Sequence, residues 1–192
     1  MRLAVFASGS GSNFEAITKA AKSGMINGSV EVLICDKQNA YALKRAEKLG
    51  VPAYVFQAKE FESKAAFESA ILKKLEENQI ELIILAGYMR LVGGTLLSAF
   101  EGRILNIHPS LLPAFPGLDA VGQAMDAGVK VTGVTVHYVD AGMDTGPIIA
   151  QEPLKIYSGD KKEVVQKKIQ QVEHQLYPEV IQYVIEELSG RV

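Results

Sequence analysis

Three kinds of side chain that together suit acyl transfer occur in the second half of this 192-residue sequence. Asn106 and His108 lie two residues apart at the end of an apolar run, within RILNIHPSLLPAFPG. An amide N–H and a protonated imidazole can both donate hydrogen bonds to an oxyanion. Asp140 and Asp144, in the turn DAGMDTGP, are candidate partners that would orient the imidazole and favour its charged form. No Ser or Cys nucleophile adjoins them, which favours direct attack by a substrate amine.

A second candidate site is the small polar loop that follows the first apolar run, SGSGSNFEAI. Its glycines would let the backbone approach a ligand, and the following helix would direct free N–H groups at an anion. Phe14 stands where a dinucleotide fingerprint has its third glycine, and the lysine of a P-loop is missing. The pattern favours a single terminal phosphate. Two alternatives stay open: nicotinamide binding, with Asp36 as the ribose-binding acid, and a plain turn with Asn13 as helix N-cap.

Alternating strand and helix patterns must position both candidate sites. Apolar runs predict strands at 3–7, 30–35, 52–56, 80–86 and 103–107, and helical spacing predicts helices at 14–23, 40–49, 63–78 and 94–100. This alternation predicts an α/β fold, a mostly parallel sheet with helices on both faces, whose ligands bind beyond the carboxyl ends of the strands. The β-branched run 131–140 and the run IIAQEPLKI predict an antiparallel C-terminal strand pair. A last helix at 161–188 should break or kink at Pro178.

Composition narrows the class of protein. The length suits one domain, and the net charge of −2 gives no electrostatic case for binding nucleic acid or an anionic membrane. No apolar run is long enough to span a bilayer and no signal peptide is recognisable, so we expect a cytoplasmic protein. Cys35 is the only cysteine, and neither His137 nor His174 has ligand spacing with His108. We therefore expect no metal site, a buried inert thiol, and structural roles for the other two histidines.

Five motifs resemble those of a known enzyme family, in order and over nearly the whole chain: FASGSGSNFEAI, LAGYMRLV, NIHPSLLPAFPG, GVTVHYVDAGMDTGPIIAQ and EHQLYPEVI. The family is the phosphoribosylglycinamide formyltransferases. The resemblance implies transfer of a formyl group from 10-formyltetrahydrofolate to the amine of glycinamide ribonucleotide in purine biosynthesis, without a metal. It implies one Rossmann-like domain over 1–192, with a phosphate-binding half at 1–100 and a catalytic and folate-binding half at 101–192. We expect small-molecule partners and either a monomer or a homodimer.

The resemblance also implies roles for individual residues. The catalytic trio would be Asn106, His108 and Asp144. The ribonucleotide phosphate would be bound by Gly11, Ser12 and Asn13, and its glycinamide end by Glu173. The folate would be bound by Lys64, Met89, Arg90, Leu91, Val92 and Asn106, with residues 89–92 acting largely through backbone groups.

Two positions depart from the pattern of the family. Asp119 stands where some members have a histidine, two residues after the Pro-Gly pair that ends the proline loop (residues 109–117). Ala114 stands where some members have a basic residue. Neither change touches the trio, but a supporting role for position 119 does not carry over. The family also suggests a cis Leu112–Pro113 bond, although most X–Pro bonds are trans.

Four other functions compete with this interpretation. Formyltetrahydrofolate hydrolase and methionyl-tRNA formyltransferase share the HPSLLP chemistry, but the first usually adds an N-terminal regulatory domain and the second a C-terminal RNA-binding domain. We expect neither domain here, and the loop SGSGSN favours a small phosphorylated acceptor. The missing third glycine argues against a nicotinamide-dependent oxidoreductase. The Asn-His-Asp set argues against a non-catalytic nucleotide-binding module.

Overall fold

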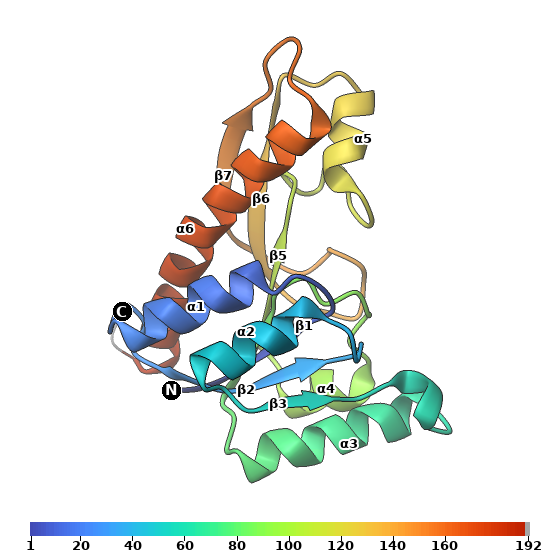
Figure 1. Cartoon of the computed structure of the whole chain (residues 1–192), viewed down its shortest axis with the longest axis vertical. Coiled ribbons are helices and arrows are strands. Elements are labelled where there is room, and N and C mark those ends of the chain that lie inside the picture. Colours follow the sequence, from blue (N-terminus) through green and yellow to red (C-terminus); the bar gives the residue numbers. More distant parts are fainter. Residues whose placement is uncertain (191–192) are drawn as a thin grey trace.

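The computed structural model describes residues 1–190 and forms one seven-stranded sheet with helices on both faces (Figure 1). The strands are β1 (Arg2–Ala7), β2 (Ser29–Cys35), β3 (Ala53–Val55), β4 (Leu82–Leu85), β5 (Ile104–His108), β6 (Val131–Tyr138) and β7 (Ile148–Lys155). The helices are α1 (Ser12–Lys22), α2 (Tyr41–Leu49), the 3-10 turn η1 (Ala58–Glu60), α3 (Lys64–Glu77), α4 (Gly94–Ala99), α5 (Ala120–Asp126) and α6 (Lys162–Leu188). The predicted α/β class is confirmed.

The strand order explains where ligand-binding loops can gather. The sheet runs β3-β2-β1-β4-β5-β6-β7, with parallel pairing from β3 through β5 and antiparallel pairing of β6 and β7, as predicted. The chain winds from β1 toward β3 on one side and then returns to β4 on the other. The loops after β1 and β4 therefore diverge at a topological switch point, the usual ligand site of such sheets.

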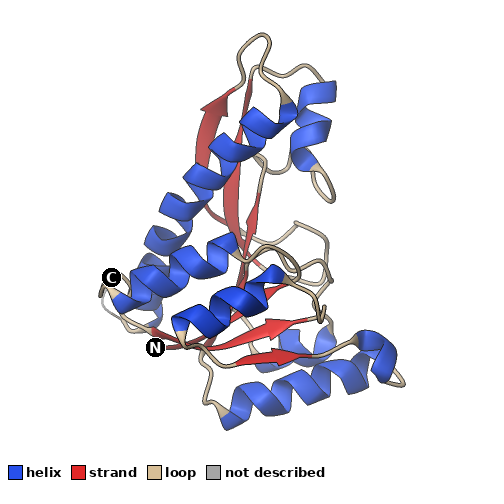
Figure 2. Ribbon diagram, viewed as in Figure 1, coloured by secondary structure: helices blue, strands red, loops and turns tan. Residues whose placement is uncertain are grey.

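Two helical layers cover the sheet (Figure 2). Along β1, Leu3, Val5 and Ala7 pack into the core beneath α1, α2 and α6, whereas Ala4 and Phe6 pack into the core beneath α3 and α4. This alternation is what a strand buried on both faces requires. Among residues 1–190, no helix combines the length and the apolar character needed to cross a bilayer.

Three local predictions differ from the structure. The prediction for Pro178 was a break or a kink, and the break is wrong, because α6 is continuous through this residue. Tyr177, Val180 and Ile181 around it are buried in the core. Packing of this face against the sheet offsets the one backbone hydrogen bond that a proline cannot donate. The sequence pattern did not predict α5, whose N-cap is Asp119.

The third difference concerns the start of α1. Its N-cap is Gly11, with a φ of 73°, rather than Asn13. Asn13 lies within the first turn, and its side chain is directed at α6 instead of capping its own helix.

Candidate active site

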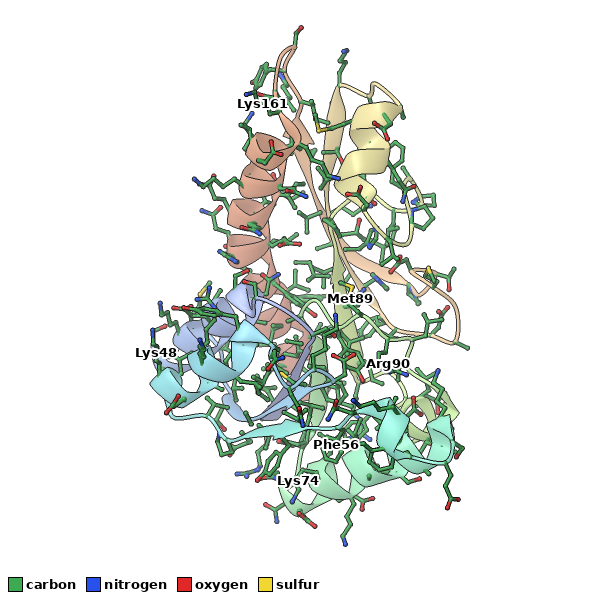
Figure 3. All side chains as sticks on the ribbon, turned by 45° about the vertical axis from the view of Figure 1, so that its right-hand side comes forward. Lys48, Phe56, Lys74, Met89, Arg90 and Lys161 are labelled. Atoms are coloured by element: carbon green, nitrogen blue, oxygen red, sulfur yellow. The ribbon has the colours of Figure 1, made fainter. Side chains whose placement is uncertain are left out.

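A cleft of about 520 Å³ lies at the carboxyl edge of the parallel strands, between the loops that follow β4, β5 and β6. The predicted site residues that line it are Asn13, Met89, Arg90, Leu91, Val92, Asn106, His108, Asp144 and Glu173. In Figure 3, Met89 and Arg90 lie near the middle of the molecule, between α3 and the strands of the C-terminal half. Gly11, Ser12 and Lys64 lie outside this lining.

His108 and Asp144 contact each other in the cleft. His108 Nδ1 lies 3.4 Å from Asp144 Oδ2, and both side chains are largely buried. The other ring nitrogen, Nε2, lies 2.9 Å from the carbonyl oxygen of Phe115, which can only accept a hydrogen bond. Each ring nitrogen of His108 therefore faces an oxygen atom of the protein. Asp144 is fixed in turn by the backbone N–H of Gly117, which donates to Oδ2 at 2.8 Å.

His137 orients Asn106 from the neighbouring strand. The two residues are paired across β5 and β6, and Asn106 Nδ2 lies 3.2 Å from His137 Nε2. His137 Nδ1 donates to the carbonyl oxygen of Tyr138 at 2.8 Å, so Nε2 of the neutral ring accepts from the amide. Burial lowers the pKa of His137, against a smaller opposing effect of the Tyr138 carbonyl and Asp144, which favours that neutral form.

This contact places His137 beside Asn106 in the cleft, which the sequence did not reveal. Alternation along 131–140 predicted a structural histidine, since the register that sets it opposite Asn106 is a tertiary property. We call Asn106, His108, His137 and Asp144 the histidine cluster. Each member contacts at least one other member, although they come from two strands and one loop.

The proline loop is held beneath His108 by a buried polar network. Ser110 Oγ donates to the carbonyl oxygen of Ala114, and the Thr135 hydroxyl donates to the carbonyl oxygen of Ser110 at 2.7 Å. Gln151 Nε2 lies 2.9 Å from the carbonyl oxygen of Leu112. The Leu112–Pro113 bond is cis, as the family suggested. These contacts fix the segment that presents the Phe115 carbonyl to His108.

The other aspartates near the cleft hold local structure. Asp140 accepts hydrogen bonds from Gly142 N and Thr145 Oγ1, so it stabilises its own turn and is not the partner of the imidazole. Asp119 accepts from Gly122 N and pairs with Lys162 at 2.6 Å. The hydrogen bond from Lys162 lowers the pKa of Asp119. Asp119, which departs from the family pattern, therefore caps α5 and links it to α6 through Lys162.

The glycine–serine loop, residues 8–13, is shaped by close backbone contacts. Gly11 has a left-handed φ of 73°, and a Cβ there would lie 2.6 Å from Ala42 Cβ and 2.7 Å from Ala42 Cα. Only glycine fits this position without displacing α2. Arg45 of α2 donates from Nε to the carbonyl oxygen of Ser10 at 2.9 Å and also pairs with Glu15. Contacts with α2 thus fix the backbone of the loop, while Gly9 and Ser10 are exposed to solvent.

Asn13 and Glu173 join the glycine–serine loop to α6 inside the cleft. Asn13 Nδ2 donates to Glu173 Oε2 at 3.2 Å, and both residues are about nine-tenths buried. Asn13 Oδ1 is buried without a hydrogen-bond partner among the described residues. Burial raises the pKa of Glu173 to about 7, and the hydrogen bond from Asn13 opposes this rise. These two side chains offer an acceptor and a titratable carboxyl to a polar ligand.

Residues 89–92 form part of the wall of the cleft. The segment begins where Met89 N donates to Ser8 Oγ at 2.8 Å. Met89 and Leu91 are exposed, and Arg90 lies over the ring of Phe67, 5.2 Å from its centroid. Leu118, which also lines the cleft, exposes its apolar side chain as well. Such apolar walls suit a flat heteroaromatic ring.

The remaining cysteine and histidine lie apart from this chemistry. Cys35 is buried, and burial raises the pKa of its thiol to about 12, which suits an inert core residue. His174 lies on α6 in a shallow groove beside Leu154 and Lys168, outside the cleft. Within residues 1–190, no three His, Cys, Asp or Glu side chains are grouped so as to hold a metal ion.

Comparison with known proteins agrees with the earlier resemblance. The formyl transferase family model matches residues 1–181. A phosphoribosylglycinamide formyltransferase of Bacillus subtilis is 55% identical over 184 residues, which are 96% of this chain and 94% of that protein. The crystal structure of glycinamide ribonucleotide transformylase 1 from Geobacillus kaustophilus is 60% identical, with a TM-score of 0.93, over 95% of this chain and 97% of the other. The corresponding structure from Symbiobacterium toebii is 48% identical, with a TM-score of 0.95, over 97% and 88%.

Proposed function

The chain belongs to the phosphoribosylglycinamide formyltransferases of the formyl transferase family, and we propose that its histidine cluster transfers a formyl group to the amine of glycinamide ribonucleotide. The observation that carries the proposal is the contact of His108 with Asp144 beside Asn106, in one cleft with Glu173 and residues 89–92. 10-Formyltetrahydrofolate would supply the formyl group. The amine would attack the formyl carbon directly, without a covalent enzyme intermediate.

Asn106 and His108 would stabilise the negative charge that develops on the formyl oxygen. Asn106 Nδ2 carries two hydrogens, and His137 accepts only one of them, so the second is available to the oxygen. His108 Nδ1 lies 3.4 Å from Asp144, a long contact that leaves its N–H able to reach a substrate atom as well. Donors fixed before the reaction are worth more than donors that must reorganise.

Asp144 would keep His108 charged and receive the proton released by the attacking amine. Its Oδ2 faces both His108 and Gly117 N, while Oδ1 lies 3.9 Å from His137 Nε2. A proton lost by the amine would pass through this carboxylate, or through a water beside it, to the folate nitrogen that leaves. The bond to the amine forms as the bond to the folate nitrogen breaks, so charge and protons balance.

The ribonucleotide would extend from the cluster toward the N-terminal half. Its phosphate would bind the backbone of Gly11, Ser12 and Asn13 at the start of α1, which accounts for the exposed turn before that helix. Glu173, held by Asn13, would contact the glycinamide end. Placing both ends of the substrate would hold its amine close to the formyl carbon.

The folate would lie along residues 89–92 and reach Asn106. Met89, Leu91 and Leu118 provide exposed apolar surface for its ring, and the backbone of 89–92 would supply polar contacts. Lys64 would approach the folate from outside the cleft, beside Gly93.

A formyl-transfer assay with the purified protein tests the proposal. With both substrates present, we expect loss of 10-formyltetrahydrofolate to match formylation of the ribonucleotide one for one. Loss of 10-formyltetrahydrofolate without any acceptor would instead indicate a hydrolase. Stabilisation of the protein by NADH alone, with neither substrate converted, would favour an oxidoreductase and contradict the proposal.

A further inference from the structure

Glu68 is a buried carboxylate that the proposed chemistry does not use. It lies on α3, is only 2% exposed, and forms no ion pair within residues 1–190. Burying a carboxylate without a cation is costly unless strong hydrogen bonds replace its hydration. The buried carboxylate of Glu68 is therefore expected to accept specific hydrogen bonds.

The contact is with the end of the 89–92 segment. Glu68 Oε1 accepts from Gly93 N at 2.5 Å, and Oε2 lies 3.4 Å from Leu96 N. Gly93 is the N-cap of α4 and has no side chain to cap the helix itself. Glu68 therefore caps α4 from a different helix, and in doing so fixes the residue that directly follows Val92.

The space around Gly93 is a second indication of how closely the Glu68 carboxylate approaches the backbone there. A Cβ at this position would lie 2.8 Å from Glu68 Oε1, 2.9 Å from Oε2 and 2.7 Å from Lys64 Cε. Gly93 has ordinary extended backbone angles, so its conformation does not call for glycine. What excludes a side chain there is the Glu68 carboxylate together with the end of Lys64.

The two ends of the segment are thus tied to different parts of the core. At its start, Met89 N donates to Ser8 Oγ, and at its end Gly93 N donates to Glu68. Between these anchors, Met89 and Leu91 are exposed to the cleft. A backbone that recognises a ligand must be fixed before binding, because misplacement by even about 1 Å can cost on the order of 100-fold in rate.

We infer that Glu68 is a positioning residue for the folate: it holds the backbone of 89–92 through Gly93 without touching the substrate. The inference rests on the proposed function for the identity of the ligand. The anchoring itself is a property of the free protein and can be measured without any ligand.

Two pairs of variants test the inference. Glu68→Gln keeps the volume of the side chain but offers one acceptor oxygen where the carboxylate offers two, and Glu76→Gln changes an exposed glutamate of the same helix as control. Gly93→Ala drives a methyl group into the carboxylate, whereas Gly94→Ala places one where no atom lies within 4 Å. We expect Glu68→Gln and Gly93→Ala to raise the KM for 10-formyltetrahydrofolate by about tenfold. The KM for the ribonucleotide should change less than about twofold, and the controls should match the wild type.

Hydrogen exchange of the free protein separates this inference from the proposed function. Amides in 89–93 should exchange faster in Glu68→Gln and Gly93→Ala than in either control. Unchanged exchange and unchanged folate KM in both variants would overturn the inference, as would an equal rise in both KM values. A wild-type protein that transfers no formyl group would contradict the proposed function instead, leaving exchange at 89–93 to decide whether Glu68 anchors the segment.

Discussion

The histidine cluster and the glycine–serine loop lie at the same edge of one sheet but are held in opposite ways. In the cluster, side chains fix one another: His137 holds Asn106, and Asp144 faces His108 at 3.4 Å. In the loop, the backbone is fixed by α2, through the close approach of Ala42 to Gly11 and the hydrogen bond from Arg45 to Ser10. The cluster is largely buried, whereas the tip of the loop is exposed.

This contrast indicates that the histidine cluster serves the chemistry and the glycine–serine loop serves substrate binding. Buried donors whose partners are already in place can stabilise developing charge without reorganising. An exposed turn of small residues at a helix start can bind an anion but offers no group for proton transfer. Damage to the cluster should therefore lower kcat, and damage to the loop should raise the KM for the ribonucleotide.

The largest effect is expected from His108→Ala. Removing an oxyanion donor and the partner of Asp144 should lower kcat by about 10³-fold or more, with little change in either KM. Steady-state assays with both substrates measure this. His174→Ala, on α6 and outside the cleft, is the matched control and should keep activity near that of the wild type. A His108→Ala enzyme with comparable turnover would exclude His108 from the chemistry.

His137→Ala tests whether orientation inside the cluster matters. Without the acceptor at Nε2, the Asn106 amide is free to rotate, and kcat should fall by about 10- to 100-fold. The KM for each substrate should stay within about threefold, because the contact that is lost orients the Asn106 amide. If both KM values rise while kcat is preserved, His137 contributes to the shape of the cleft and not to the orientation of the amide.

Gly11→Ala tests the loop. The new Cβ meets Ala42 and the backbone is left-handed, so the turn must shift, and the KM for the ribonucleotide should rise by about tenfold or more. The kcat at saturation should fall less than in His108→Ala. Gly9→Ala is the control, since no atom lies within 4 Å of a Cβ there. Equal effects of the two alanines would show that the close approach to α2 is unimportant.

The last effect concerns Glu173 and is seen in stability rather than in activity. Burial raises the pKa of this carboxyl from 4.5 to about 7, so the folded protein binds the proton more tightly than the unfolded chain. Stability from this group is fully present below pH 4.5 and is lost as the pH rises toward 7, by up to about 3 kcal/mol. Glu173→Gln should therefore gain stability relative to the wild type between pH 5 and pH 8.

Urea unfolding at both pH values measures that difference. Glu179→Gln, an exposed change on the same helix, should show no such pH dependence. A free-energy difference between Glu173→Gln and the wild type that stays constant from pH 5 to pH 8 would mean that Glu173 is ionised as readily in the fold as in the unfolded chain.

The fold could be predicted from the sequence where local periodicity was strong. The run IELIILA became the central strand β4, and the alternation at 131–140 became β6, paired antiparallel with β7. The short helix α5 lacks such a pattern, because its seven residues are too few to establish a helical period and include a glycine. The break predicted at Pro178 was wrong because the rule against proline inside a helix considers only local structure. The stability of α6 comes instead from its packing.

Most of the residues that line the cleft were predictable from the sequence, but their contacts with one another were not. His108 and Asn106 stood out at a strand end, and both line the cleft. That His137 would contact Asn106 depends on the register of β5 and β6, and that Glu68 would reach Gly93 depends on the packing of α3 on α4. The residues alone left Asp140 and Asp144 open as partners of His108. The family resemblance implied Asp144, and the structure places Asp144 against the imidazole.

The division between the cluster and the loop is tested most directly by titrating glycinamide ribonucleotide calorimetrically into His108→Ala and Gly11→Ala. We expect His108→Ala to bind the ribonucleotide with a Kd within about threefold of the wild type, and Gly11→Ala to bind about tenfold or more weakly. If His108→Ala loses binding as severely as Gly11→Ala, or Gly11→Ala binds as tightly as the wild type, binding and chemistry are not divided between these two regions.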